Sequence, residues 1–476
     1  MKKIIKILNF LDTTMQKKLL FFLKFSLLCT YLLNFSLSAA AFEDDLVVGL
    51  ETDSPLVPIY LTPLINERSS FAEEYLKQLE QVIAFDLSSN GSSYLVKQTA
   101  ENNALATRSA RDQFDSLLDW QKKNIFFVIK GWVENKAISF VLLDVQTKSL
   151  KKIETISLTG NLNEDRLHMH RISDLIHKAF FGTNGIASTK IIYSIRTKQG
   201  QDSQKWISEI WEADYDGANA RQLTQENSYC ISPVYIPPKA GFVTGGYMYV
   251  SYKLGQPKIY MASFKENKAH RLTNLKGNQL MPAIARQRDQ VAFISDVAGN
   301  PDLFIQPFNP EKGADGKPQQ IFSARQAAQG SPTFSPDGKR IAFVSNKDGS
   351  PKIYIIKIPE AGSSLKNIQA QLISKRNREN SAPAWSPDGN KIAYCAKHGG
   401  DRQIWVYDFK TNQEKQISEG AGNKENPSWA PDSLHLVFNS SDEKQSELYL
   451  INLNQKEAIK ISKGAGEKRF PNWEIR

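Results

Sequence analysis

The chain has 476 residues, a formal net charge of +10 and an apolar fraction of 41%. This length is too great for one ordinary domain, and the composition is that of a globular protein rather than a disordered or collagen-like one. Because the basic surplus is not gathered into a long block, it indicates a mixed, solvated surface rather than a nucleic-acid partner.

The first 41 residues have the three parts of a secretory signal. Lys17-Lys18 precedes an apolar run over 19–37, and small residues at 38–41 end it. This pattern predicts cleavage before Phe42 and export of the mature protein. Met15 is an alternative start of translation, and a retained membrane anchor is the weaker alternative because a lysine interrupts the run. Removing the segment would take away six Lys and one Asp, leaving a net charge of +5.

An acidic arm is predicted over 42–66. It has five acidic residues and no Lys or Arg. Leu46–Val48 has strand character, whereas three prolines limit regular structure after it. Composition leaves two interpretations open, a disordered leader and a docking peptide for a partner.

An α+β domain is predicted over 67–185, because helical periodicity alternates with short strand-like runs. Ser69 is in position to cap its first helix, whose first turn is acidic, and Gly182 is in position to end its last helix. The expected elements are a helix over 69–83, a strand over 94–96, a helix near 111–120, antiparallel strands over 126–133, 138–145 and 153–158, and a helix over 163–181.

A repeated unit fills residues 186–476. In its most complete copy, Ser331–Ile356, the turn Ser335-Pro336-Asp337-Gly338 joins two runs of β-branched and aromatic residues, which is typical of a hairpin. The Pro that opens the unit recurs every 44 to 51 residues, at Pro233, Pro282, Pro332, Pro383, Pro427 and Pro471. A period of this length with four strands per copy is typical of a β-propeller blade.

The first and last copies are incomplete in complementary ways. The opening Pro segment is missing before Lys190–Tyr193, and an unpaired one, Phe470–Trp473, ends the chain. Pairing the two predicts a ring of six blades without exposed sheet edges. The predicted fold class is therefore an α+β N-terminal domain followed by an all-β six-bladed β-propeller, closed by pairing of the C-terminal strand with the first blade. Cys230 and Cys395 fall in different repeats, so both are expected to be free and buried.

The sequence contains no catalytic motif of the common classes. It has no G-x-S-x-G elbow, H-E-x-x-H, phosphate loop or C-x-x-C. His168, His170 and His177 share one predicted helix, but offsets of two and nine do not place all three on one metal-binding face. We therefore predict no catalytic residue, no cofactor and no metal ligand. The alternative is a secreted propeller hydrolase or lactonase with a metal in its axial channel.

The stretch that joins the two predicted domains resembles that of a known family. His170–His177, Gly182, Gly185 and Ser188–Tyr193 are similar to the interdomain signature of the TolB family, the periplasmic propeller proteins of the Tol–Pal system. The SPDG-type turns and the terminal Phe470-Pro471-Asn472-Trp473 are similar to the same family. The resemblance covers essentially the whole mature chain. It implies a non-enzymatic scaffold of the periplasm that supports outer-membrane integrity and cell division.

The resemblance also implies two partners, and membrane association only through them. The inner-membrane protein TolA would bind the arm, at Glu43, Asp44, Asp45, Leu46, Val47 and Val48. The peptidoglycan-associated lipoprotein Pal would bind the propeller face opposite the SPDG turns, where loops before the opening Pro meet loops between the second and third strands. The candidate residues around this mouth are Asn278, Gln279, Gln329, Arg376, Asn377, Arg378, His398, Asp401, Lys424, Glu425, Asn426 and Arg469.

Overall fold

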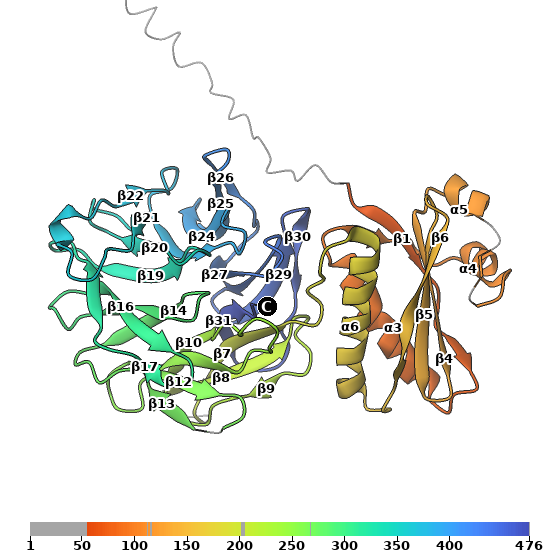
Figure 1. The fold of residues 1–476 in the computed structure, drawn as a ribbon, viewed down its shortest axis with the longest axis horizontal. Helices are drawn as coiled ribbons and strands as arrows, with labels where there is room; N and C mark the ends of the chain where they lie inside the picture. Colours follow the sequence, from red (N-terminus) through yellow and green to blue (C-terminus); the bar gives the residue numbers. More distant parts are fainter. Residues whose placement is uncertain (1–54, 112, 115–116, 201–204, 267, 476) are drawn as a thin grey trace, which may run out of the picture. The chain divides into compact units, whose positions relative to one another are not determined.

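The computed structural model describes residues 55–111, 113–114, 117–200, 205–266 and 268–475. These residues belong to one compact unit, Leu50–Arg476. The predicted signal peptide and the candidate arm residues at 43–48 lie outside the described residues. Within them the chain forms an α+β domain and a β-propeller (Figure 1).

The α+β domain is built on a six-stranded sheet with the order β3-β1-β4-β5-β6, and β2 lies beside β4. β1 is parallel to both of its neighbours, while β4, β5 and β6 form the predicted antiparallel meander. The strands are β1 (Val57–Leu61), β2 (Ile65–Glu67), β3 (Ser93–Leu95), β4 (Phe127–Glu134), β5 (Ala137–Asp144) and β6 (Ser149–Ser157). β1 lies between β3 and β4, although it contains Pro58. The sheet therefore begins inside the segment 42–66 that was predicted to be an arm.

Helices cover both faces of this sheet. Because side chains alternate along β1, Ile59 and Leu61 face one core, where α3 and α6 pack, while Tyr60 faces another, where α4 and α5 pack. The helices are α3 (Glu73–Ser88), α4 (Ala100–Thr107), α5 (Leu117–Lys122) and α6 (Leu162–Phe181). None of the described helices is long and apolar enough to cross a membrane.

Two helix predictions were wrong. α3 begins after Ala72, which makes no side-chain capping bond, so Ser69 is not its cap. The Ser69 hydroxyl instead lies 2.7 Å from Oδ1 of Asn66, in the turn before the helix. The single helix expected near 111–120 is replaced by two shorter helices: α4 ends before that stretch, and α5 overlaps its last four residues.

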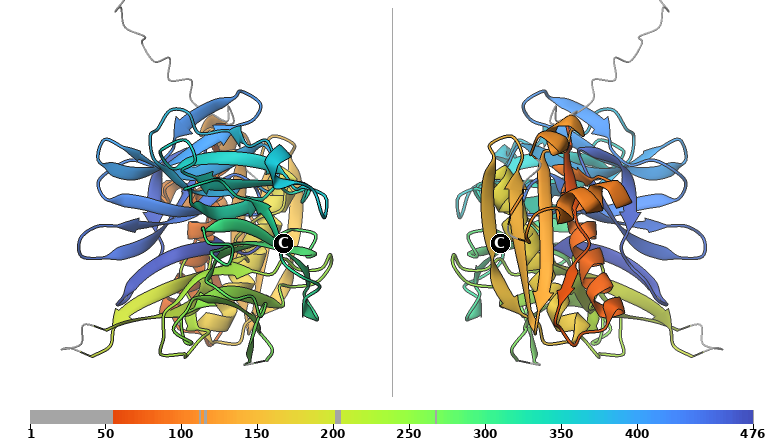
Figure 2. Two further views of the ribbon diagram at one scale, coloured as in Figure 1. Left: turned by 90° about the vertical axis from the view of Figure 1, so that its left-hand side faces the viewer. Right: turned by 90° about the vertical axis from the view of Figure 1, so that its right-hand side faces the viewer.

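The propeller has six blades, each an antiparallel sheet that runs outward from the axis. The left view of Figure 2 looks onto the propeller with the α+β domain behind it.

The strands, from the innermost outward, are as follows. Blade 1 has β31 (Glu467–Trp473), β7 (Lys190–Lys198), β8 (Trp206–Asp214) and β9 (Arg221–Gln222), and blade 2 has β10 (Cys230–Tyr235), β11 (Gly246–Ser251), β12 (Lys258–Ser263) and β13 (Ala269–Arg271). Blade 3 has β14 (Gln279–Ile284), β15 (Gln290–Ser295), β16 (Asp302–Asn309), β17 (Gly313–Ala314) and β18 (Gln319–Phe322), the last two both pairing with β16. Blade 4 has β19 (Gln329–Phe334), β20 (Arg340–Ser345), β21 (Lys352–Lys357) and β22 (Gln371–Leu372), with a short 3-10 helix, η1 (Leu365–Asn367), before β22. Blade 5 has β23 (Asn380–Trp385), β24 (Lys391–His398), β25 (Asp401–Asp408) and β26 (Gln413–Gln416), and blade 6 has β27 (Asn423–Trp429), β28 (His435–Ser441), β29 (Ser446–Asn452) and β30 (Gln455–Lys460).

Every innermost strand carries the same β-bulge. In blade 4 the register between β19 and β20 shifts between Gly330 and Thr333, and the other five blades shift at the corresponding place. The residue before the opening Pro has a positive φ in each blade, at Ser232 (51°), Met281 (54°), Ser331 (44°), Ala382 (48°), Asn426 (55°) and Phe470 (54°). Since this conformation is uncommon for residues other than Gly, its repetition shows that blade geometry imposes it.

The ring closes as the sequence predicts. β31 is the innermost strand of blade 1, and its ladder with β7 runs from Glu467 opposite Arg196 to Trp473 opposite Ile191. Arg196 and Glu467 also form an ion pair at 2.6 Å. The indole N–H of Trp473 donates to the hydroxyl of Thr189 at 2.8 Å. Backbone and side-chain bonds therefore join the two ends of the propeller.

Three smaller predictions are confirmed. Gly182 ends α6 in the left-handed conformation, and its N–H donates to the Lys178 carbonyl at 3.0 Å. Cys230 and Cys395 are free and buried. In the turn of blade 4, the N–H of Gly338 donates to the carbonyl of Ser335 at 2.9 Å.

Candidate functional site

A buried hydrogen-bonded joint connects the α+β domain to the propeller. Tyr215, in the turn after β8, donates to Oδ1 of Asp86 on α3 at 2.7 Å. Nδ1 of His170 on α6 lies 2.9 Å from Oδ2 of the same carboxylate. All three side chains are buried. Because an unpaired buried carboxylate would be costly, Asp86 holds two helices and one propeller turn together. We call Asp86, His170, Asp214, Tyr215 and Asp216 the domain joint.

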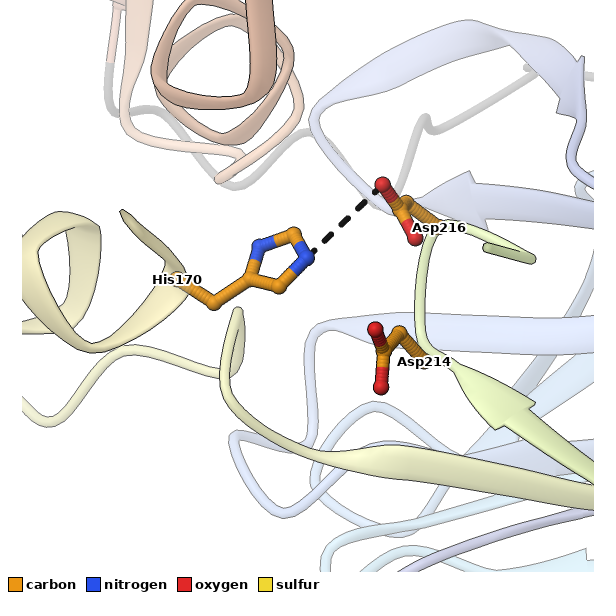
Figure 3. A group of neighbouring side chains, drawn as sticks. All are labelled: His170, Asp214 and Asp216. Atoms are coloured by element: carbon orange, nitrogen blue, oxygen red, sulfur yellow. Dashed lines mark ion pairs between the residues drawn. The ribbon is translucent and has the colours of Figure 1, made fainter. Parts of the chain in front are cut away.

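Figure 3 shows His170 facing the two propeller carboxylates of the joint, Asp214 and Asp216. Its Nε2 lies 3.8 Å from Oδ2 of Asp216. Burial alone would lower the pKa of His170, but the charge of Asp86, followed by those of Asp216 and Asp214, outweighs burial and raises that pKa. The imidazolium form is therefore favoured inside the joint.

His170, Asp214 and Asp216 also have the composition of a metal site, because their ligand atoms lie within 4.8 Å of one another. However, Arg166 pairs with Asp216, and Lys190 pairs with Asp214 at 2.6 Å. A divalent cation would have to displace both of these cations from the carboxylates. The donor set therefore fits a network of ion pairs better than a metal site.

A second set of bonds ties α6 to the segment that enters the propeller. The carboxylate of Asp174 accepts from the backbone N–H groups of Ala187 at 2.8 Å and Ser188 at 3.0 Å. Three residues after Asp174, Nε2 of His177 lies 3.0 Å from the hydroxyl of Thr183. Burial lowers the pKa of His177 to about 4, so this histidine is neutral at pH 7.

Blade 6 supplies the third contact between the domains. Nε2 of His435 lies 2.7 Å from the carbonyl oxygen of Ser89, just after α3, and its Nδ1 lies 2.6 Å from Asp432. The amide of Asn454 donates to the carbonyl of Gly91 at 2.6 Å. His435 follows the SPDG-type turn of blade 6, so the α+β domain contacts the propeller face that bears these turns. The predicted mouth lies on the opposite face.

A cavity of about 280 Å³ lies along the propeller axis and is lined by the innermost strands of all six blades. Its walls are mainly prolines, aromatic rings and backbone, including the six bulge residues. Among the described residues that line it, only Arg286 is charged, and none is an Asp, Glu, His or Cys. The cavity wall thus offers few of the side chains that bind metals or act as general acids and bases.

The mouth has the predicted construction. Each innermost strand begins against the preceding blade's loop between its second and third strands. In blades 3, 4 and 5 the first N–H of that strand donates to a carbonyl of this loop, from Gln279 to Pro257 at 2.9 Å, from Gln329 to Pro301 at 2.8 Å and from Asn380 to Pro351 at 2.9 Å. The two kinds of loop therefore lie side by side on one face.

Several predicted mouth residues have structural roles instead of free side chains. Gln279, Gln329, Asn377 and Lys424 are buried. The ammonium of Lys424 donates to three carbonyl oxygens of the loop that enters blade 6, those of Gly420, Ala421 and Gly422. Such residues shape the mouth and could contact a partner only after rearrangement.

The remaining predicted mouth residues are partly or fully exposed. Some are paired within the mouth: Asn278 with Asp296, Asp401 with the Gly422 N–H, Glu425 with Arg402, Asn426 with Asn439 and Arg469 with Glu467. Arg376, Arg378 and His398 are exposed. The guanidinium of Arg376 also reaches the carbonyl of Glu414 at 3.2 Å. The two exposed arginines of the predicted mouth therefore lie in the loop that enters blade 5.

Comparison with known proteins places the chain in a family. A family model described as the TolB beta propeller domain matches residues 177–475. The chain belongs to the TolB family. A protein TolB homolog from Protochlamydia amoebophila is 58% identical over 83% of this chain and 85% of the relative. Another from Chlamydia caviae is 36% identical over 79% of this chain and 81% of the relative. The crystal structure of TolB from Acinetobacter baumannii covers 89% of this chain and 97% of its own, with a TM-score of 0.71 at 20% identity, and so has the same fold.

The interdomain residues that resemble the TolB family connect the two domains. His170 contacts Asp86, and Ser188 donates its backbone N–H to Asp174. At Gly185 an added Cβ would lie 2.2 Å from Oδ1 of Asp174, so only Gly fits between α6 and the linker. The similarity to TolB in this stretch therefore reflects the construction of the joint.

Proposed function

We propose that this TolB-family protein is a non-enzymatic, periplasmic protein-binding scaffold of the Tol–Pal system. It links the peptidoglycan-associated lipoprotein Pal to the inner-membrane Tol complex, through TolA, and supports outer-membrane integrity and cell division. The observation that carries the proposal is the position of the mouth. The α+β domain packs on the face of the SPDG-type turns, at His435 and Asn454, so the mouth loops remain on the surface and open to a partner.

Pal binds at the mouth in this proposal. Arg378 and His398 are exposed there, and arginine is enriched in protein interfaces. The guanidinium of Arg376, in the same loop as Arg378, donates to the carbonyl oxygen of Glu414. Binding at exposed loops leaves the buried residues of the mouth, such as Lys424, in their structural role.

TolA binds the acidic arm over 42–66 in this proposal, at the residues before β1. The arm has five acidic residues and no basic ones, whereas the rest of the mature chain is basic. An arm that docks weakly on its own protein leaves a released population that a second partner can capture. Any coupling between the arm and the mouth must be reciprocal: Pal changes the affinity for TolA by the factor by which TolA changes the affinity for Pal.

Titration calorimetry with the soluble domain of Pal tests the mouth. The Arg378→Glu variant reverses an exposed charge at the mouth, and Lys339→Glu reverses an exposed charge at a turn of the opposite face. We expect the first to weaken binding and the second to leave it unchanged. Lys339 is a better control than Asp337, because the Asp337 carboxylate accepts hydrogen bonds that hold its turn. Equal affinities for both variants would contradict the assignment of the mouth.

The second candidate is a propeller hydrolase or lactonase with a metal in the axial cavity. The cavity wall argues against it, since metal-assisted hydrolysis needs carboxylate or imidazole ligands, and the described lining residues include neither. A turnover screen against lactones and glycosides with added divalent metals distinguishes the two candidates. Metal-dependent turnover would favour the enzyme.

A further inference from the structure

The mouth is not uniform around the ring. Among the described propeller residues, the large apolar side chains that are exposed on this face come from blades 1 to 3: Trp206 (37%), Leu254 (63%), Met281 (40%) and Val297 (38%). Leu254 and Val297 lie in loops between the second and third strands, Trp206 begins β8 at the end of such a loop, and Met281 is a bulge residue. Exposed apolar side chains that gather on one face of a protein mark an interaction surface.

Several charges on this apolar side are paired within the protein. Lys253, next to Leu254, forms an ion pair with Glu226 at 2.6 Å. The carboxylate of Asp296, next to Val297, accepts from the side chain of Asn278 at 2.6 Å. Arg196 pairs with Glu467 while its guanidinium lies 4.3 Å from the ring of Trp206. Lys198, Lys205 and Lys276 are also exposed on this side. What sets it apart is therefore its exposed apolar side chains rather than an absence of charge.

Blades 4 and 5 form the opposite, cationic side. Lys375, Arg378 and Lys397 are exposed, and no ion pair of their side chains is found among the described residues. Arg378 lies in the loop that enters blade 5, as does Lys375, and Lys397 lies near the end of β24 at the same face. These side chains are free to attract carboxylates of an approaching molecule.

We propose that the two sides of the mouth divide the recognition of one protein partner. The partner surface carries apolar side chains that pack on the apolar side, Trp206, Leu254, Met281 and Val297, and carboxylates that face the cationic side, Lys375, Arg378 and Lys397. This inference rests on the proposed function, in which the mouth binds Pal. It adds the chemistry and the orientation that the partner must have. Long-range attraction to the cationic side speeds association, and contact with the apolar side prolongs the complex.

Binding kinetics at a series of salt concentrations test this division, with the soluble domain of Pal as the probe. The double variant Arg378→Glu/Lys397→Glu should lower the association rate constant about tenfold at low salt and flatten its salt dependence. The double variant Leu254→Ser/Val297→Ser should raise the dissociation rate constant about tenfold and leave the salt dependence as in the parent. Matched controls on the opposite face are Lys339→Glu, for charge, and Phe242→Ser, whose side chain is 70% exposed.

Each outcome is decisive. If the two mouth variants change the same rate constant to the same extent, or if the apolar variant binds like the parent, the division is wrong although the mouth still binds Pal. If the parent does not bind the Pal domain, the proposed function fails, and this inference fails with it. In that case, binding of the parent to vesicles rich in phosphatidylglycerol, lost in the Arg378→Glu/Lys397→Glu variant, would assign the cationic side to a membrane instead of a protein.

Discussion

The hydroxyl of Tyr215, in the propeller, donates a hydrogen bond of 2.7 Å to the carboxylate of Asp86, in the α+β domain. Both side chains are buried. Trp473 lies on the strand that closes the propeller, and the centroid of its indole ring is 6.4 Å from the centroid of the Tyr215 ring. β31, the strand that closes the propeller, is therefore adjacent to the domain joint. A substitution that destabilises one of them should also destabilise the other.

The Tyr215→Phe variant tests the joint. It removes one donor from a buried carboxylate that keeps its contact with His170, so the free energy of unfolding should fall by about 1 to 3 kcal/mol. Urea unfolding measures the change. Tyr94→Phe is the matched control, because the Tyr94 side chain is 46% exposed. If both variants unfold at the same urea concentration, the bond between Tyr215 and Asp86 does not stabilise the fold.

The two buried histidines of α6 should give stability a maximum between acid and alkaline pH. The pKa of His170 is raised above its usual 6.5, so its contribution is complete below pH 6.5 and is lost as pH rises through the folded-state pKa. The pKa of His177 is lowered to about 4. Its neutral form is favoured in the fold, so stability is lost as pH falls from 6.5 toward 4.

The His170→Gln and His177→Gln variants separate these two effects. His170 faces three carboxylates, those of Asp86 on α3, Asp214 at the end of β8 and Asp216 in the turn after it. Its replacement should therefore flatten the loss of stability on the alkaline side. Replacement of His177 should reduce the loss on the acid side. The urea midpoint measured from pH 4 to 9 gives both limbs. A variant that shifts the whole curve without changing its shape would show that the histidine does not titrate as described.

Removal of residues 470–476 tests the closure. It takes away the part of β31 that pairs Asn472 and Trp473 with β7, and with it the Trp473 bond to Thr189. The exposed edge of β7 in blade 1 should cause aggregation or a large fall in melting temperature. Removal of Arg476 alone is the control. A shortened chain that melts like the parent would contradict closure through this strand.

Lys424 should stabilise the mouth rather than bind a partner directly. In the Lys424→Met variant three carbonyl oxygens lose their donor, so the free energy of unfolding should fall by about 1 to 3 kcal/mol. The Arg378→Glu variant, at an exposed position, should leave the melting temperature unchanged and weaken binding of Pal. Calorimetric melting of both variants gives the comparison. A Lys424→Met variant that melts like the parent would return this lysine to the candidate binding residues.

Much of the propeller was predictable because its signals are local. The opening prolines and the turn from Ser335 to Gly338 repeat in sequence, and backbone conformation depends on them directly. The C-terminal segment Phe470–Trp473 matched the missing start of blade 1, which was enough to predict closure. The cap of α3 was mispredicted because Ser69 bonds Asn66 instead of the helix.

The joint was not predictable, because its partners are distant in sequence. His170 and His177 share one helix, but only the fold brings Asp86 and Asp216 to His170. Burial lowers the pKa of His177, whereas the charge of Asp86 outweighs burial and raises the pKa of His170. The role of Lys424 was mispredicted for a similar reason. A lysine is usually exposed, but the ammonium of Lys424 is buried and donates to backbone carbonyls, which have no signature in sequence.

In the proposed function, one chain holds two protein partners at separate sites, Pal at the mouth and TolA at the arm. The most direct test is calorimetry with both partner domains on the parent, on the Arg378→Glu variant and on a chain that lacks residues 42–53. We predict that the deletion abolishes TolA binding and retains Pal binding, while Arg378→Glu weakens only Pal binding. Undiminished TolA binding by the chain without its arm would contradict the account.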